Sequence, residues 1–294
     1  MKDLFPGIEY MNHNVRPDYQ KLNTEARNPR TMHIDKLPTL DMVKLMAEEN
    51  RVVEDAVAAE AGHIADAIDL IADALQAGGH LIYVGAGTSG RLGVLDASEC
   101  PPTFGVDYDL VRGIIAGGQS AMFRASEGAE DNEAQGRADL IADGVQAGDV
   151  VVGLSASGGA PYVLGALAQA AELGAVPIGV TCNPDSRMHP ICRVTIAPVV
   201  GAEVITGSSR LKAGTAQKLV LNMLSTGAMI KTGKVMGNLM VNVRPTNQKL
   251  QLRCLRIIRE LTGCDDEMAK QAFDACDGEI RKAVAYIEKN AQNT

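Results

Sequence analysis

The sequence predicts an α/β protein built on a doubly wound, five-stranded parallel sheet, followed by a small C-terminal module of three helices. Five short runs are apolar along their whole length, and alanine-rich segments with helical spacing lie between most of them. Strands that are apolar throughout and alternate with helices are typical of a parallel sheet covered on both faces. Glycine- and hydroxyl-rich stretches follow two of these runs, at the sheet edge where such folds bind ligands.

The N-terminal segment is expected to be an arm over residues 1–44, because prolines and polar residues dominate it without a clear hydrophobic period. Helical spacing begins at Asp41 and continues to Ala77. Its clearest part is a stripe of residues three or four apart that would share one helix face: Ile64, Ile68, Ile71 and Leu75. The pair Gly78-Gly79 then marks the end of this helical region.

The main domain is expected over residues 45–245. Its five predicted strands are 81–84, 111–116, 149–154, 176–181 and 194–199. Its predicted helices after the first strand are one that begins after Gly90, then 131–145, 161–173 and 210–231. We expect the first of these helices to end at Cys100, because two prolines follow it directly and proline lacks the N–H that continues a helix.

The last 49 residues, 246–294, differ in character and are predicted to form three short helices. These helices are expected at 249–261, 265–275 and 279–290, with Gly263 and Gly278 between them.

Composition excludes several classes of partner. The formal net charge is −8, so a polyanion is repelled, and neither nucleic acid nor an acidic membrane is an expected partner. No apolar run approaches the ~20 residues that a membrane span needs. The N-terminus has no export signal and the six cysteines have no C-x-x-C spacing, so we expect a cytoplasmic protein with reduced thiols and no metal.

The first glycine-rich stretch, Gly85-Ala86-Gly87-Thr88-Ser89-Gly90, follows a strand and precedes a helix. It satisfies the G-x-G-x-x-G pattern of dinucleotide-binding folds. That pattern also expects an acidic residue at the end of the second strand, to hold the ribose hydroxyls. Here the second strand ends in Gly117-Gly118 instead, so a nicotinamide or flavin cofactor is not the favoured interpretation.

Two more stretches of the same kind favour a phosphate site. Ser155–Gly158 follows the third predicted strand, and Thr206–Arg210 precedes the long helix. Small residues allow close backbone approach, and helix N-termini present free N–H groups to an anion. No lysine follows these glycines in the way that nucleoside triphosphate sites require. The alternative role of these serines and glycines is to form tight turns and helix caps. The predicted phosphate ligands are Gly87, Thr88, Ser89, Gly90, Ser155, Ser157, Gly158, Ser208 and Ser209.

Two acidic positions are candidates for proton transfer. Glu99 lies at the predicted end of a helix, where the helix dipole favours the protonated form expected of a general acid. Glu127 and Glu130 lie near the start of the next helix, where an ionised base is stabilised, and helical position alone does not choose between them. Nine residues of straight helix place Glu99 roughly 13 Å from the glycine-rich stretch, so either the helix bends or Glu99 serves a site across a subunit interface.

Several motifs carry a family resemblance. The glycine- and serine-rich stretches resemble the sugar isomerase (SIS) fold, which binds phosphosugars. Four longer motifs resemble the N-acetylmuramic acid 6-phosphate etherase family, and the likeness runs from about residue 22 to the C-terminus. These motifs are TEARNP at 24–29, LDASECPPTF at 95–104, EGAED at 127–131 and EVITGSSRLKAGT at 203–215.

The resemblance implies a cytoplasmic, cofactor-free, homodimeric lyase. Such an enzyme cleaves the C3 ether of N-acetylmuramic acid 6-phosphate to N-acetylglucosamine 6-phosphate and D-lactate during cell-wall recycling. It also implies that Glu99 is the proton donor and Glu130 its partner, and that the C-terminal helices form a module similar to ubiquitin-associated domains. Lys212 is expected either to assist an oxyanion or to form a plain salt bridge. The alternatives are an aldose–ketose isomerase on the same fold and a non-catalytic sugar-phosphate sensor.

Overall fold

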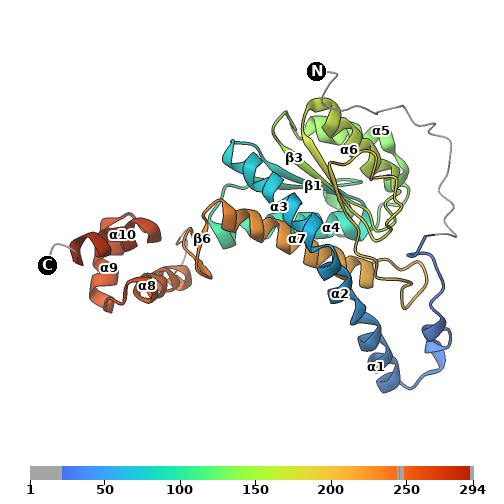
Figure 1. Cartoon of the computed structure of the whole chain (residues 1–294), viewed down its shortest axis with the longest axis horizontal. Coiled ribbons are helices and arrows are strands. Elements are labelled where there is room, and N and C mark those ends of the chain that lie inside the picture. The colour runs from blue at the N-terminus through green and yellow to red at the C-terminus, as the bar shows by residue number, and fades with distance from the viewer. Residues whose placement is uncertain (1–21, 244, 246–247, 292–294) are drawn as a thin grey trace.

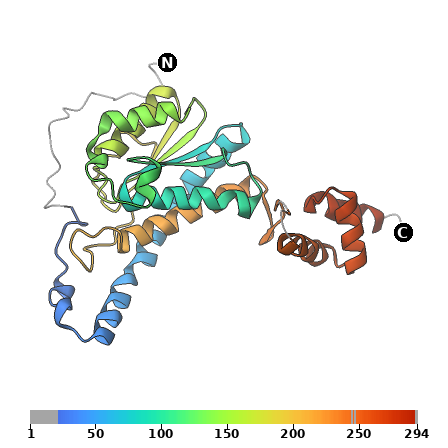
Figure 2. The same cartoon turned by 180° about the vertical axis from the view of Figure 1, so that it is seen from behind.

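A computed structural model describes residues 22–243, 245 and 248–291, and its central element is a five-stranded parallel sheet in the order β2-β1-β3-β4-β5. Figures 1 and 2 show helices on both sides of this sheet. The first 21 residues of the predicted arm lie outside the described residues. The strands are β1 (Leu81–Gly85), β2 (Val111–Ile115), β3 (Val150–Leu154), β4 (Val176–Val180) and β5 (Val194–Ile196). All five coincide with the predicted runs, β1 being one residue longer and the other four shorter, so the predicted fold class is confirmed.

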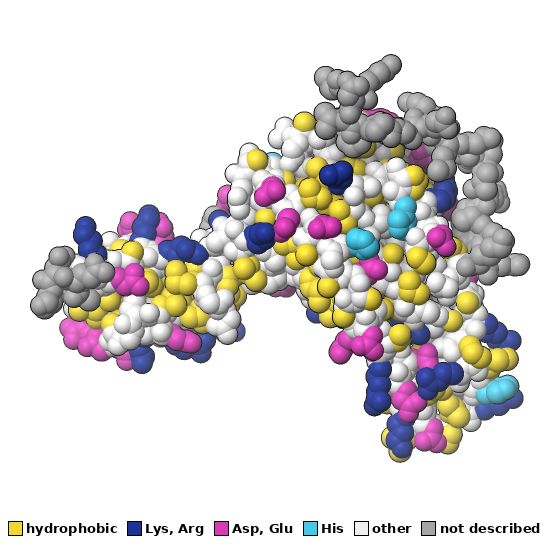
Figure 3. Space-filling model, viewed as in Figure 1, with side chains coloured by type: hydrophobic (Ala, Val, Ile, Leu, Met, Phe, Trp, Pro, Cys, Tyr) yellow, Lys and Arg dark blue, Asp and Glu magenta, His cyan; other side chains and the backbone are white. Residues whose placement is uncertain are grey.

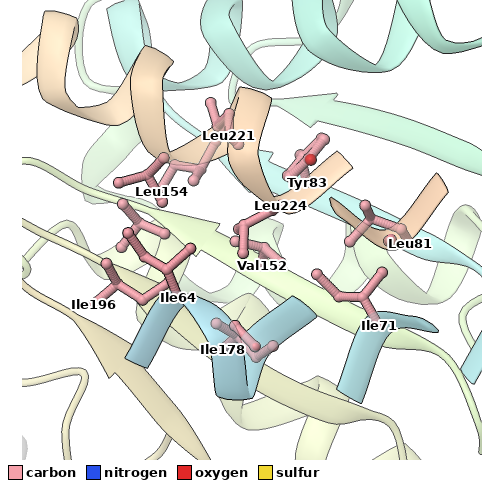
Figure 4. Close-up of a cluster of buried hydrophobic side chains, with 14 of the residues drawn as sticks. Ile64, Ile71, Leu81, Tyr83, Val152, Leu154, Ile178, Ile196, Leu221 and Leu224 are labelled. Carbon is pink, nitrogen blue, oxygen red and sulfur yellow. The ribbon is translucent and has the colours of Figure 1, made fainter. Parts of the chain in front are cut away.

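Side chains of the central strands alternate between two buried clusters, one on each face of the sheet. Val150 and Val152 of β3 pack with α3 (Ala61–Gln76), α4 (Gly87–Phe104) and α7 (Lys212–Lys231). Val151 instead packs with α5 (Glu133–Ala142) and α6 (Pro161–Leu173). Figure 4 shows the first cluster, in which Tyr83, Ile71 and Leu224 belong to a strand and to two helices that lie far apart in the sequence.

The ligand-binding edge of the sheet is set by this topology. The helix after β1 covers one face, whereas the helix after β3 covers the other, and β1 and β3 are hydrogen-bonded neighbours. Doubly wound sheets of this strand order bind their ligands outside the carboxyl ends of two such neighbouring strands, so this edge is where a ligand is expected.

The region predicted as helical from Asp41 to Ala77 contains three helices: α1 (Thr39–Asn50), α2 (Val52–Ala59) and α3. Breaks occur at Arg51 and Glu60. Figure 1 shows that α3 lies on the sheet, whereas α1 projects beyond the body of the domain.

The end predicted for α4 was wrong, because the helix continues through Pro101 and Pro102 to Phe104. Both prolines lack the N–H of a regular last turn, so this turn needs other support. Gly105 adopts a left-handed conformation (φ 63°), and its N–H donates to Pro101 O at 2.9 Å. Asn242 Nδ2 also donates to Phe104 O at 2.7 Å, so a residue distant in the sequence stabilises the end of the helix.

The three predicted C-terminal helices are present as α8 (Gln248–Thr262), α9 (Asp266–Ala275) and α10 (Ile280–Ala291). Their apolar faces form a separate buried cluster that includes Cys254, Ile258 and Phe273. An antiparallel hairpin that the sequence analysis did not predict, β6 (Val235–Met236) and β7 (Leu239–Met240), precedes this module. Among the described residues, no helix combines the length and apolarity that crossing a membrane requires.

Candidate active site

The first glycine-rich stretch forms the turn between β1 and α4. Gly87 has a φ of 54°, a conformation that side chains other than glycine rarely adopt, and it begins the helix. The first N–H groups of a helix have no intrahelical partner, so those of Gly87, Thr88 and Ser89 are available to an anion. A β-carbon on Gly90 would lie 2.6 Å from Gly85 O, so Gly90 lets the helix approach the strand closely.

The second stretch, residues 155–160, turns from β3 into α6 beside the first. Ser155 is buried, and its Oγ accepts hydrogen bonds from Gly158 N at 3.1 Å and Ala160 N at 3.4 Å. Its Oγ also lies 3.3 Å from Ser157 Oγ. Ser155 therefore does cap a turn, as the alternative interpretation expected. Because an accepting hydroxyl still carries its own hydrogen, the cap is compatible with donation to a ligand.

Position 158 needs glycine, because both its backbone conformation and its neighbours leave no room for a side chain. Its φ is 70°, and a β-carbon there would meet the side chain of Ser186 and lie 2.7 Å from Thr181 Oγ1. The segment after β4 thus packs directly under the serine turn. Asn183, which is 4% exposed, strengthens this packing because its Nδ2 donates to Ala156 O at 3.0 Å.

The third stretch lies at the N-terminus of α7 and meets the first. Ser208 and Ser209 are half-buried, and Gly214 N donates to Ser209 O at 2.9 Å. A β-carbon on Gly214 would lie 3.5 Å from Thr88 Cγ2, which places the start of α7 against the start of α4. The structure therefore brings all nine predicted phosphate ligands to one rim of the sheet.

The described part of the N-terminal segment also reaches this rim, which the sequence analysis did not foresee. Asn23 N donates to Asn183 Oδ1 at 2.9 Å, and Asn183 Nδ2 lies 3.4 Å from Thr24 Oγ1. Glu25 lies over the third stretch, because a β-carbon on Gly207 would be 3.2 Å from Glu25 Oε2. Residues 23–25 thus form part of the wall around the rim.

Glu130 lies near the same rim. It belongs to a single 3-10 turn, η5 (Ala129–Asp131), in the segment that follows β2, and its side chain is exposed. Its neighbour Ala129 packs in the same apolar cluster as Ala160, which directly precedes α6. The carboxylate of Glu130 is therefore carried by a segment that packs beside the serine turn.

Glu99 is not brought to the rim of its own chain. It lies twelve residues after Gly87 on a helix that runs away from the rim, which corresponds to about 18 Å along the axis. The helix is continuous through Glu99 to Phe104, and the Glu99 side chain is exposed. Of the two explanations considered from the sequence, the one that needs a short helix is not met, because α4 has 18 residues.

Lys212 forms a salt bridge, which is one of the two roles predicted for it; the other was to assist an oxyanion. Its Nζ lies 3.3 Å from Glu49 Oε2, and both side chains are buried. Glu49 Oε2 also accepts from Asn28 Nδ2 at 2.6 Å. Glu203, with no exposed surface, accepts hydrogen bonds from the N–H groups of Lys212 and Ala213 at 2.9 Å each. Lys212 therefore joins the N-terminal segment and α1 to the start of α7.

A further buried residue contacts a predicted ligand. Ser89 Oγ donates to Gln217 Oε1 at 2.8 Å, and Gln217 is 1% exposed. The sequence analysis missed Gln217. The sequence does carry a signal for it. Gln217 shares a predicted helix face with Ala213, Ala216 and Val220, and it is the polar residue on a face that is otherwise small or apolar.

Potential metal ligands form no cluster of three among the described residues, and the Cys100 and Cys182 side chains are buried. Among the described residues, no group of three or more histidines, cysteines, aspartates or glutamates is arranged to hold a metal ion. All six cysteines are free, and burial raises the pKa of the Cys100 and Cys182 thiols to about 12. A thiol with so high a pKa stays protonated at neutral pH and is a poor nucleophile.

The strand order, together with hydroxyl-rich turns at the ends of β1 and β3, agrees with the sugar isomerase (SIS) fold. Residues 63–171 match the family model described as the glucokinase regulatory protein N-terminal SIS domain. The solved structure of a phosphoheptose isomerase from Francisella tularensis has the same fold, with a TM-score of 0.50 and 16% identity over 66% of this chain and all of that one.

Full-length relatives place the chain more narrowly. An N-acetylmuramic acid 6-phosphate etherase of Clostridium botulinum (strain Loch Maree) is 54% identical over 92% of this chain and 90% of the relative. One from Pectobacterium atrosepticum is also 54% identical, over 92% of this chain and 89% of the relative. The chain belongs to the N-acetylmuramic acid 6-phosphate etherase family.

Proposed function

We propose that this protein is a lyase that cleaves the C3 lactyl ether of N-acetylmuramic acid 6-phosphate in cell-wall recycling. The products are N-acetylglucosamine 6-phosphate and D-lactate. One observation carries the proposal: three hydroxyl-rich turns meet at one rim, in a chain that matches etherases over nearly its whole length. Serine hydroxyls and helix N–H groups suit a phosphate, because they donate hydrogen bonds to its oxygens.

Elimination is the first half of the proposed reaction. The ring opens, and the C1 aldehyde acidifies the proton on C2. Glu130 removes that proton as the C3–O bond breaks, so a double bond forms between C2 and C3. Glu99 donates a proton to the departing lactate oxygen, because an alkoxide is a poor leaving group. The phosphate contacts hold C2 and C3 in place against the two acids.

Water addition completes the reaction. Glu99, now ionised, takes a proton from a water molecule whose oxygen bonds to C3. Glu130 returns its proton to C2, and both glutamates regain their starting states. The net change is one water consumed and one lactate released, so neither an oxidant nor a cofactor is needed.

A homodimer is part of the proposal because Glu99 lies about 18 Å along α4 from the phosphate rim of its own chain. Glu99 of one subunit would face the rim and Glu130 of the other. The projecting helix α1 offers a surface for such pairing, since Leu40 and Val43 on one of its faces are 64% and 55% exposed. Figure 3 shows hydrophobic side chains among charged ones on the projecting part of the molecule that contains α1. Six free thiols suit the reducing cytoplasm, where we place the enzyme.

The deciding experiment is incubation of the purified protein with N-acetylmuramic acid 6-phosphate, followed by enzymatic assay of D-lactate. We expect stoichiometric lactate and N-acetylglucosamine 6-phosphate. An isomerised sugar phosphate without lactate would indicate the aldose–ketose isomerase instead. Binding without any turnover would indicate the sugar-phosphate sensor, and either result would overturn the lyase.

A further inference from the structure

Gln217 lies directly beneath the phosphate-binding rim, in the interior of the protein. It projects from α7, and its Oε1 accepts the hydroxyl hydrogen of Ser89 at 2.8 Å. Of the buried side-chain nitrogens and oxygens in the described residues, its Nε2 is the one without a hydrogen-bond partner. An unpaired amide nitrogen at this depth is costly, so it calls for a physical explanation.

The Ser89 hydroxyl has one hydrogen to donate, and this limits what it can do. In the present arrangement that hydrogen is given to Gln217. Phosphate oxygens act mainly as acceptors, so Ser89 has no hydrogen left for a phosphate while Gln217 holds it. The contact seen here and the proposed role of Ser89 therefore exclude each other unless Gln217 changes.

A half-turn of the Gln217 amide removes this conflict. The oxygen and nitrogen of an amide have nearly the same size, so the rotation needs no change in packing. Nε2 then donates to Ser89 Oγ, and the Ser89 hydrogen is free for the phosphate. One hydrogen bond between Gln217 and Ser89 replaces another, while the new bond from Ser89 to phosphate is charge-assisted and stronger.

We propose that Gln217 is a positioning residue that rotates its amide on phosphate binding and directs the Ser89 hydroxyl toward the phosphate. The proposal rests on the proposed function, because it takes the rim to be the phosphate site. It adds a residue that touches no substrate and acts through Ser89. It also explains why the buried stripe of α7 carries an amide beneath Ser89.

Two substitutions of similar size separate the possible roles. Gln217→Glu can accept from Ser89 but, when ionised, cannot donate to it, so the Ser89 hydrogen stays on the wrong partner. We expect the dissociation constant of N-acetylglucosamine 6-phosphate to rise about tenfold, which is the effect of losing the Ser89 hydrogen bond to the phosphate. Gln217→Met removes both interactions and leaves Ser89 unoriented, for which we expect a rise of about fivefold. Calorimetric titration with this ligand and with inorganic phosphate measures both.

The Ser89→Ala background tests whether Gln217 acts through Ser89. There, Gln217→Met should change the dissociation constant by less than twofold, because the group it orients is gone. An equal effect of Gln217→Met with and without Ser89 would overturn the inference, as would a Glu variant no worse than the Met variant. Ser225→Ala, which removes another buried polar group of α7, is the control and should leave binding unchanged.

The titrations require folding but no turnover, so their outcome is separate from that of the lactate assay. Thermal unfolding of each variant checks the fold, and either Gln217 variant alone suffices for the comparison with Ser89→Ala. A wild-type protein that binds neither ligand would overturn the phosphate site and the proposed function together. A wild-type protein that binds both, with the two Gln217 variants unchanged, would overturn this inference alone.

Discussion

The two ends of helix α4 differ in how much of a site each provides within one chain. At its N-terminus, Thr88 and Ser89 meet residues of α7, and the pairing of β1 with β3 sets the second turn beside them. Twelve residues on, Glu99 is exposed on the surface. The rim that we assign to phosphate binding is thus assembled by the fold of one chain, whereas the proposed proton donor points out of that chain.

The difference between the two ends of α4 separates phosphate binding from proton transfer. Binding energy needs several donors fixed at once, and a parallel sheet fixes them because its strand ends share one edge. A proton donor needs access to the reacting atoms and to water for part of the cycle. The second half of α4 supplies a rigid support for Glu99, since Asp96 in the preceding turn is held by Tyr83 and Asn222 at 3.0 and 2.7 Å.

The strongest test of the comparison uses two inactive variants. Glu99→Gln and Glu130→Gln should each lower kcat about a thousandfold, the size expected for loss of a general acid or base, with KM little changed. If the two glutamates of a site come from different subunits, hybrid dimers of the two variants contain one intact site. Co-expression should then restore about one quarter of the wild-type lactate release, since about half of the dimers are hybrids.

Inactive hybrid dimers would contradict the assignment of the two glutamates of a site to different subunits. In that case each site holds both glutamates of one chain, and the two ends of α4 do not serve different subunits. Full turnover by Glu99→Gln on its own would instead remove Glu99 from the mechanism. Mixing either variant with wild-type protein controls for loss of activity through co-expression alone.

A smaller effect is expected at the N-terminal end of the helix. Ser89→Ala removes one charge-assisted hydrogen bond to the phosphate, so KM should rise about tenfold while kcat stays within about threefold. Steady-state lactate release measures both constants. Ser98→Ala is the matched control, since Ser98 lies on the same helix and its Oγ donates to Leu95 O. An unchanged KM in Ser89→Ala would show that this turn is purely structural.

The smallest effect concerns the buried support beneath Glu99. Burial raises the pKa of Asp96 above its ordinary value, although hydrogen bonds from Asn222 and Ser225 oppose the change. The folded state therefore holds the proton more tightly than the unfolded chain, and stability falls as pH rises above about 4, the usual pKa of an unfolded aspartate. The amide in Asp96→Asn does not titrate, so the free energy of unfolding of this variant should increase relative to that of the wild type between pH 4 and 7.

Urea unfolding at these two pH values measures the difference. We expect the free energy of unfolding of Asp96→Asn, relative to wild type, to increase by on the order of 1 kcal/mol over this range, a usual size for one substitution. Parallel changes in the two proteins would show that Asp96 ionises as easily in the folded state as in the unfolded chain. The support for Glu99 would then carry no electrostatic cost.

Much of the fold was accessible from the sequence because its signals are local. The five apolar runs and the helix 161–173 need no knowledge of the rest of the chain, and the structure has them where the pattern predicts. The hairpin at Val235–Met240 was missed because two residues per strand give no alternation to read. The end of α4 was misplaced because Asn242 and Gly105, not the prolines, decide where it stops.

The sequence by itself determined the fold class, the family and which side chains gather at the carboxyl ends of the strands. The fold class and the predicted site residues follow from hydrophobic spacing and from glycines and serines that directly follow strands, whereas the family follows from the resemblance of four longer motifs. The tertiary structure alone decided that Lys212 is held by Glu49, that Gln217 contacts Ser89 and that Glu99 lies far from the rim of its own chain. The physical reason is that local patterns act through the backbone within a few residues. Buried pairs join residues more than a hundred positions apart, and the packing of helices on the sheet is what selects them.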